Sequence, residues 1–428
     1  MERVACALAT TLREDSGLPH VLLGRDTRES GAWIEDALAR GIRAGGGEAA
    51  AAGVVTTAGV AFLTRAGGYG AGVMISASHN PYDDNGIKIF SRDGFKLPDD
   101  NEARIEALVL DGGLPGSGRE TASRPRVRGA ALEILEPYLL LLTTASGGTS
   151  LSGMRVVLDC ANGAACGTAP EVFRRLGAEV HALSEAPDGR NINEGCGSLH
   201  PEAMCRAVVA RGADFGFAFD GDADRCIGSD DKGQVCDGDF IMYRSALALA
   251  SAGALEAGTV VGTVMSNLWL ELALGSHGIK LLRAPVGDKY VLEEMIRTGA
   301  RLGGEQSGHV IFRDHATTGD GILTAVMMAS IVKRAGVPLS VWRSEVRPCP
   351  QILLNVRVSS RPRLEEHPAI SAASERVRER LGPGGRLLLR YSGTEPLARV
   401  MIEGEDGVLV ERLARELASL IEREIGAS

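Results

Sequence analysis

The chain has 428 residues, 44% of them hydrophobic, and a formal net charge of −9. At roughly 100–200 residues per domain this length predicts about two to four domains. The acidic balance argues against an extended nucleic-acid-binding face, and the longest apolar runs, such as 322–332, are too short to span a membrane. The eight cysteines form no C-x-x-C pair and no signal peptide is recognisable, so we expect a protein of the reducing cytoplasm.

Short β-like runs alternate with helical stretches along most of the chain, which predicts α/β units with parallel strands. The pattern begins with a strand at 21–23 and a helix at 31–44, and it restarts near 155 and again near 259. The last ~80 residues instead combine three strand-like runs with one amphipathic helix, which is typical of a smaller α+β domain.

The segment Met74–Pro81 places Ser78 in a polar turn directly after the apolar run 71–75. Pro81 lacks a backbone N–H and disfavours helix at the preceding residue, and His79 adds a polar side chain at the bend. Because open α/β sheets bind ligands beyond the carboxyl ends of their strands, Ser78 is a candidate reactive group. A plain turn with a capping serine is the alternative.

Asp220, Asp222 and Asp224 alternate along a loop that follows the apolar run 215–219. Three carboxylates at one locus repel one another unless a cation lies among them, and all-oxygen ligation favours Mg²⁺ over zinc. Arg225 could neutralise a phosphoryl group held on the metal. The alternatives are a calcium EF-hand loop, which would need glycine in place of Arg225, and a solvated acidic loop.

Two further segments suggest ligand binding. The glycine-rich segment 303–309 lacks the ending of a Walker loop and the pattern of a nucleophile elbow. Its Glu305 and Ser307 combine a carboxylate with a hydroxyl, which suits vicinal sugar hydroxyls. A turn from a strand into a helix, with a glycine cap, is the alternative.

A second cluster lies in the last domain. Ser392, Gly393 and Thr394 can offer two hydroxyls and several backbone N–H groups to an anion, and Arg390 adds a forked cation. Arg399 follows shortly after them. A phosphate cradle is the functional interpretation, and a plain turn is the alternative.

Together the four motifs resemble the α-D-phosphohexomutase superfamily, in which they occur in this order, one per domain. Finer details are similar to its phosphoglucosamine mutase branch, among them Asn85–Lys88, Cys160–Gly163 and Thr317–Gly321. The resemblance implies three serial mixed-sheet α/β domains of similar plan and a smaller C-terminal α+β domain around a central cleft. The expected domains are a phosphoserine-bearing domain (1–138), a metal-binding domain (139–250), a sugar-binding domain (251–346) and a phosphate-binding domain (347–428).

The resemblance also implies roles. Ser78 becomes a phosphoserine whose phosphate oxygen joins the three aspartates around one Mg²⁺ per chain. Arg25 and Lys88 become active-site cations, and Lys88 and His309 are both candidates for proton transfer. The glycine-rich segment is implied to contact the sugar hydroxyls through Glu305 and Ser307, and the C-terminal cluster to hold the non-reacting phosphate.

The implied reaction interconverts glucosamine 6-phosphate and glucosamine 1-phosphate through the phosphoserine and a 1,6-bisphosphate that turns over in the site, feeding amino-sugar nucleotide synthesis. A sugar 1,6-bisphosphate or another phosphoryl donor would serve as activator. The phosphosugar is the expected partner, with no nucleic acid and no membrane, and a homodimer is compatible with the sequence. The alternatives are a phosphomannomutase/phosphoglucomutase, a serine-dependent metallophosphatase and a sugar-phosphate-binding protein without activity.

The amino terminus departs from the pattern of the superfamily. Members normally begin with a strand and an arginine-bearing loop, whereas residues 1–10 already resemble the first helix. We therefore expect the first domain to lack that strand, which would favour the inactive alternative. A smaller departure is Tyr391, where proline is common.

Overall fold

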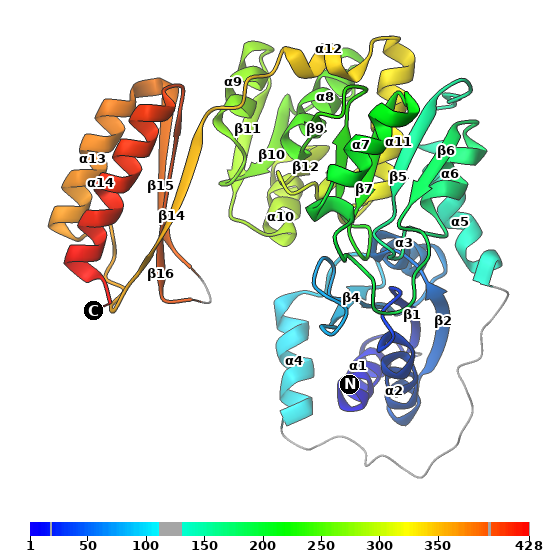
Figure 1. Cartoon of the computed structure of the whole chain (residues 1–428). Coiled ribbons are helices and arrows are strands. Elements are labelled where there is room, and N and C mark those ends of the chain that lie inside the picture. The colour runs from blue at the N-terminus through cyan, green and yellow to red at the C-terminus, as the bar shows by residue number, and fades with distance from the viewer. Residues whose placement is uncertain (18, 111–130, 393–394, 428) are drawn as a thin grey trace. The chain divides into compact units, whose positions relative to one another are not determined.

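The computed structural model of the chain describes residues 1–17, 19–110, 131–392 and 395–427 (Figure 1). These residues form two compact units. The first comprises residues 1–263 and 284–343, and the second comprises residues 264–283 and 344–428.

The first α/β sheet of unit 1 has the strand order β2-β1-β3-β4. Its β1 is parallel to β2 and β3, whereas β4 is antiparallel to β3. The apolar β3 is buried along its whole length, as expected of a strand covered on both faces. The elements are α1 (Glu2–Ser16), β1 (His20–Arg25), α2 (Gly31–Ala44), β2 (Glu48–Val54), α3 (Thr57–Ala66), β3 (Ala71–Ile75), β4 (Ile87–Ser91) and α4 (Asp99–Leu110).

The second sheet repeats this plan with the order β6-β5-β7-β8-β9, in which β5 is parallel to β6 and β7 and the last two strands are antiparallel. The buried, phenylalanine-rich β7 lies at its centre. The elements are α5 (Ala131–Thr144), β5 (Arg155–Asp159), α6 (Ala169–Arg175), β6 (Glu179–Leu183), η1 (Gly197–Leu199), α7 (Glu202–Arg211), β7 (Phe215–Phe219), β8 (Cys226–Ser229), β9 (Val235–Cys236) and α8 (Gly238–Ser251).

The remaining strands of unit 1 pair in the order β10-β12-β13, parallel and then antiparallel. The glycine-rich segment 303–309 therefore forms the turn between two antiparallel strands, so the alternative of a turn into a helix is wrong there. The elements are β10 (Thr259–Thr263), α10 (Asp288–Thr298), β12 (Leu302–Gly304), β13 (Val310–Phe312), α11 (Gly321–Ala335) and α12 (Leu339–Ser344), whose last residue belongs to unit 2.

Unit 2 contains an antiparallel sheet with the order β14-β16-β15. Two helices, α13 and α14, pack along this sheet and bury a separate apolar core (Figure 1). The elements are α9 (Leu268–Ser276), β11 (Lys280–Ala284, its last residue in unit 1), β14 (Gln351–Arg357), α13 (Pro368–Leu381), η2 (Gly382–Gly384), β15 (Gly385–Tyr391), β16 (Leu397–Gly404) and α14 (Gly407–Ile425).

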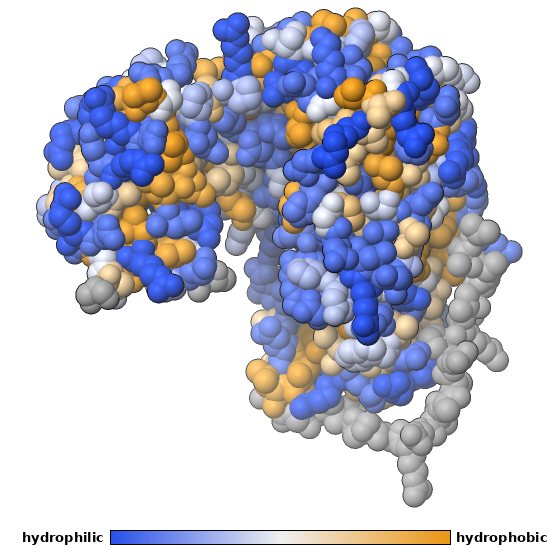
Figure 2. Space-filling model, in the orientation of Figure 1, coloured by the Kyte–Doolittle hydropathy of each residue, from blue (hydrophilic) through white to orange (hydrophobic). Residues whose placement is uncertain are grey.

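Polar residues cover most of the face drawn in Figure 2, and the apolar residues on it lie in scattered patches. Such scattered exposure is ordinary for a folded protein. Within the described part of the chain, no helix combines the length and apolarity needed to cross a bilayer.

A buried hydrogen-bonded chain joins three elements of unit 1. Thr56, which caps α3, donates to the hydroxyl of Tyr138 in α5 over 3.1 Å, and that hydroxyl donates to Asp320 Oδ2 over 2.9 Å. Asp320 also caps α11 by accepting from the N–H of Leu323. Burial raises the pKa of Asp320 to about 6.

This pKa predicts a pH-dependent stability. An exposed aspartate titrates near pH 4, so the folded chain binds the Asp320 proton more tightly than the unfolded chain does. The contribution of Asp320 to the free energy of unfolding therefore falls as the pH rises from about 4 to about 6. Asparagine caps helices as well as aspartate does but does not titrate. In urea unfolding, we expect the free energy of unfolding of the wild type minus that of Asp320→Asn to fall by about 2–3 kcal/mol between about pH 4 and pH 7.

Asp406→Asn makes the same substitution at the exposed cap of α14 and serves as the control for the loss of a capping carboxylate. If the free energies of unfolding of the wild type and Asp320→Asn differed by the same amount at every pH, the raised pKa of Asp320 would be contradicted.

Candidate active site

The loops after two parallel strands bring the predicted serine and the predicted aspartates together. Ser78 follows β3, and Asp220 directly follows β7. Although 142 positions separate them in sequence, Ser78 Oγ donates to Asp220 Oδ2 over 2.6 Å. Both groups lie beyond the carboxyl ends of their strands, where α/β sheets place their ligands.

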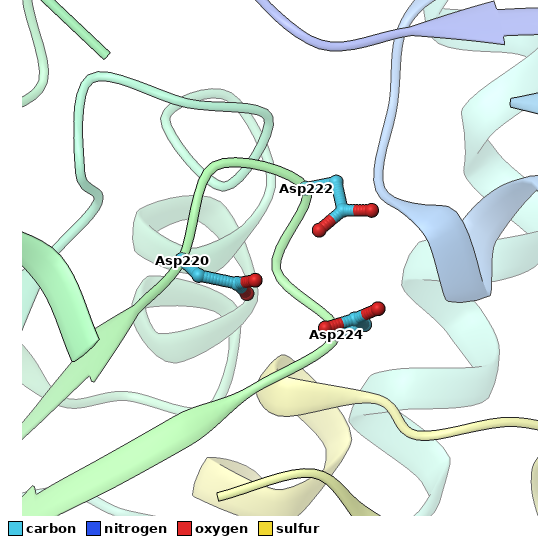
Figure 3. Close-up of side chains that lie close together, drawn as sticks. All are labelled: Asp220, Asp222 and Asp224. Carbon is cyan, nitrogen blue, oxygen red and sulfur yellow. The ribbon is translucent and has the colours of Figure 1, made fainter. Parts of the chain in front are cut away.

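The three aspartates of the loop between β7 and β8 converge, as Figure 3 shows. One carboxylate oxygen from each lies within 4.8 Å of the others, and Asp220, Asp222 and Asp224 are all buried. Burial and the two neighbouring carboxylates raise the pKa of Asp220 well above its usual range. Asp222 Oδ1 is buried without a hydrogen-bond partner among the described residues.

These observations fit a divalent cation. An orphaned buried carboxylate oxygen costs free energy, and clustered negative charges repel, so a metal ion held by oxygen ligands would relieve both penalties. The residues that could hold it are Asp220, Asp222 and Asp224, with an oxygen on Ser78 beside them. The prediction of a converging acidic loop that could bind a metal is confirmed.

Lys88 supplies the nearest positive charge. It lies in β4, and its Nζ is 2.6 Å from Asp222 Oδ2 and 2.8 Å from Asp224 Oδ2. Burial opposes its charge, but Asp222 and Asp224 outweigh that effect and raise the pKa of the ammonium above its usual range. Lys88 is therefore a charged neighbour of the acidic loop, and its role as an active-site cation stays a prediction.

His309 lies on the other side of Asp224 and is only 3% exposed. Its Nε2 accepts the N–H of Gly319 over 3.0 Å, and its Nδ1 lies 3.6 Å from Asp224 Oδ1. Asp288 Oδ2 approaches Nε2 at 3.7 Å and is in turn paired with Lys96. Both ring nitrogens thus face protein groups, an arrangement that holds the Asp224 side chain in place.

His79 and Arg225 lie at the edges of the same site. His79 Nδ1 is 3.4 Å from Ser78 Oγ, and burial together with the charge of Arg225 lowers the pKa of the imidazole. The backbone N–H of Arg225 donates to Asp220 Oδ1 over 3.0 Å. Arg25, by contrast, pairs with Glu35 of α2 at 3.1 Å, and no contact between it and Ser78 is described.

The glycine-rich segment presents its two polar side chains differently. Glu305 is half-buried, and its Oε1 accepts the N–H of Gly287 over 3.0 Å. Ser307 is exposed. Both lie in the turn between β12 and β13, in the same unit as Ser78 and the aspartates.

The C-terminal cluster lies in unit 2. Arg390 and Arg399 are direct cross-strand partners on β15 and β16, and burial and the neighbouring Arg399 lower the pKa of Arg390. Like charges in directly opposed positions repel, so an anion between them would stabilise the pair. Arg399 Nη2 lies 3.3 Å from the buried Ser392 Oγ. The predicted contributions of Gly393 and Thr394 fall outside the described residues.

Sequence reasoning missed several residues that shape the site. Thr57, at the start of α3, contacts Asp222 through both its hydroxyl and its backbone N–H. Arg28 and Asn193 bind backbone carbonyls around Ser78. Arg28 belongs to the same charged loop as Arg25 and could have been weighed with it, whereas nothing local distinguishes Asn193 from other loop asparagines.

Comparison with known proteins agrees with this geometry. Models of the four phosphoglucomutase/phosphomannomutase domains match in order: α/β/α domain I at residues 1–113, domain II at 137–233, domain III at 237–348 and the C-terminal domain at 353–420. The chain belongs to the phosphoglucomutase/phosphomannomutase family, the α-D-phosphohexomutases. The predicted family and the predicted fold of three α/β domains and one smaller domain are confirmed, whereas the finer domain boundaries stay predictions.

Curated relatives point to one branch of that family. A phosphoglucosamine mutase of Solibacter usitatus is 50% identical over 426 residues, covering 98% of this chain and 94% of its own. One from Symbiobacterium thermophilum is 52% identical over 427 residues, covering 98% and 93%.

Solved structures share the fold. A phosphoglucomutase/phosphomannomutase family protein of Burkholderia thailandensis has a TM-score of 0.79 at 23% identity, covering 99% of this chain and 93% of its own. Aspergillus fumigatus N-acetylphosphoglucosamine mutase, solved with GlcNAc-6P and magnesium, has a TM-score of 0.65 at 21% identity, covering 86% and 92%.

The close approach of two loops predicts a sensitive glycine. A Cβ on Gly221 would lie 2.6 Å from the carbonyl oxygen of Ser78 and 2.8 Å from Ile192 Cδ1. Because the first of these atoms is backbone, Gly221→Ala must displace the serine or the acidic loop. We expect unfolding in urea to report a destabilisation of about 1–3 kcal/mol.

Gly167→Ala is the matched control, since a Cβ there meets no heavy atom within 4 Å. Equal stability of the two variants would show that the loops are not in close contact.

Proposed function

We propose that this chain is a phosphoglucosamine mutase that interconverts glucosamine 6-phosphate and glucosamine 1-phosphate through a phosphoserine at Ser78 and a 1,6-bisphosphate. The observation that carries the proposal is the 2.6 Å contact between Ser78 Oγ and a buried site of three carboxylates. The near-50% identity to phosphoglucosamine mutases over almost the whole chain supports the choice of substrate.

Phosphoryl transfer depends mainly on positioning and charge neutralisation, and the residues of the site match these demands. A Mg²⁺ ion held by Asp220, Asp222 and Asp224 would supply charge neutralisation at the transferring phosphoryl group. Ser78 carries that group and gives it to the sugar hydroxyl, and Arg225 adds positive charge nearby. His309 lies beside Asp224, and Lys88 is paired with Asp222 and Asp224, so both stay candidates for proton transfer.

The sugar is proposed to bind through its hydroxyls to Glu305 and Ser307. Its non-reacting phosphate is assigned to Arg390, Ser392, Gly393, Thr394 and Arg399. The opposed Arg390 and Arg399 support this assignment because they favour a bound anion. A cradle of this kind accepts either phosphate of the bisphosphate, as turning the intermediate around requires.

The proposed enzyme works in the cytoplasm. It binds one Mg²⁺ per chain, and a sugar 1,6-bisphosphate or another phosphoryl donor is its activator. Its proposed domains are residues 1–138, 139–250, 251–346 and 347–428. Its proposed assembly is a homodimer, which sedimentation can check.

The decisive experiment incubates the full chain with glucosamine 6-phosphate, Mg²⁺ and a trace of glucose 1,6-bisphosphate. Formation of the 1-phosphate supports the mutase, release of free phosphate indicates a phosphatase, and no change indicates a binding protein. Parallel reactions with glucose and mannose phosphates test the substrate.

Ser78→Ala should abolish turnover while binding of the phosphosugar persists, and measurable turnover by this variant would refute the phosphoserine.

The metal assignment has its own test. Asp222→Asn removes one carboxylate charge from the acidic loop, and we expect it to abolish the rise in Tm that Mg²⁺ gives the wild type. Asp36→Asn, on the exposed face of α2, should respond to Mg²⁺ as the wild type does. The same Mg²⁺ response in Asp222→Asn and the wild type would argue against the site.

A further inference from the structure

The turn that carries Ser78 is built around one buried arginine. We call residues 78–84 the serine loop. Arg28 is 1% exposed, and its Nε donates to Asp26 Oδ2 over 2.9 Å, which neutralises its charge and fixes the plane of the guanidinium. Asp26 is itself held by Ser76, which lies between β3 and the serine loop.

The two ends of the guanidinium bind carbonyl oxygens of the serine loop. Nη2 donates to Ser78 over 3.0 Å and to Asn80 over 2.8 Å. Nη1 donates to Asp84 over 3.0 Å and contacts the carbonyl of Pro81. With Nε on Asp26, all five N–H groups of Arg28 are used, and four of them are on this one loop.

A second side chain reaches the same carbonyls from the neighbouring domain. Asn193, in the segment between β6 and α7, donates through Nδ2 to Ser78 over 2.9 Å and to Asn80 over 3.0 Å. Asn193 itself adopts a positive φ of 60°, a conformation that asparagine tolerates better than most residues. Two carbonyls of the serine loop are therefore each held by groups from two domains.

This double attachment matters because Ser78 has a strained backbone. Its φ of 51° lies in the left-handed region, which residues with a Cβ rarely adopt and which persists only where the surroundings enforce it. The direction of the Ser78 carbonyl and the direction of its Cα–Cβ bond follow from the same backbone torsions. Holding the carbonyl therefore fixes Cβ, and the hydrogen bond to Asp220 fixes the rotation about Cα–Cβ that places Oγ.

We propose that Arg28 and Asn193 are positioning residues, which clamp the Ser78 carbonyl and so keep Oγ in line for phosphoryl transfer. Neither side chain has a described contact with the carboxylates of Asp220, Asp222 or Asp224, so they act through Ser78. The inference rests on the proposed function of Ser78 and adds how its geometry is maintained. Asn193 also makes that geometry depend on the second domain, which carries the acidic loop.

The test uses Asn193→Gly, which removes the donor but keeps the positive φ free of strain, and Arg28→Lys, which keeps a charge but loses the forked geometry. The rate at which glucose 1,6-bisphosphate phosphorylates Ser78 is followed by intact mass in single-turnover reactions. In both variants we expect this rate and kcat to fall about ten- to a hundredfold, because a small misplacement of a reacting group has effects of this size.

KM for glucosamine 6-phosphate should stay within about twofold of the wild type, since no contact used for substrate binding is removed. Arg297→Lys is the control, because Arg297 is exposed and pairs with Glu294 within α10, outside the serine loop. Unfolding midpoints show whether each variant is folded at the assay temperature, and Asn193→Gly alone carries the test if Arg28→Lys is not.

The outcomes separate this inference from the proposed function. Wild-type rates in folded Asn193→Gly, or a change confined to KM, would overturn the clamp while leaving the mutase intact. Absence of mutase activity and of Ser78 phosphorylation in the wild type would instead overturn the proposed function. A loss of kcat and phosphorylation rate with KM preserved supports the clamp.

Discussion

The mutual repulsion of three buried carboxylates is the constraint on which the active site depends. Asp220, Asp222 and Asp224 converge on one small volume, and charges so close in a poorly hydrated site are strongly unfavourable unless they are compensated. The surrounding domains provide that compensation from outside the loop. Lys88 contributes an ammonium, and Ser78 contributes a hydroxyl hydrogen bond.

Because the compensating groups come from another domain, the acidic loop and the serine loop are interdependent. Gly221 allows the acidic loop to approach the Ser78 carbonyl, and Thr57 binds Asp222 from the start of α3. Ser78 and Ala223 both adopt positive φ values, of 51° and 56°. Strained backbone of this kind is typical of functional sites, where the surrounding structure enforces it.

Sequence predicted those features of the site that are local. Ser78 and the aspartates each follow an apolar run, so the topology of α/β sheets places them at the same edge. The partner of Arg25 could not be predicted, because pairing with Glu35 depends on how β1 and α2 pack. The strand β4, which carries Lys88, was not predicted because it has only five residues, and the alternation that begins at Ile87 is broken by Phe90.

The roles of Arg28 and Asn193 lie further from sequence reasoning. Both bind backbone carbonyls, and the direction of a carbonyl is set by torsions that no residue pattern specifies. A buried arginine with every N–H satisfied becomes recognisable only when the fold is known. The family as a whole was predictable because its four motifs occur in a fixed order along the chain.

The position of Lys88 has a consequence for the charge of the acidic loop. Its ammonium lies 2.6 and 2.8 Å from one oxygen each of Asp222 and Asp224. This positive charge is covalently tethered to the chain and cannot diffuse away. Part of the negative charge of the loop is therefore balanced by the protein itself, whatever the ionic composition of the surroundings.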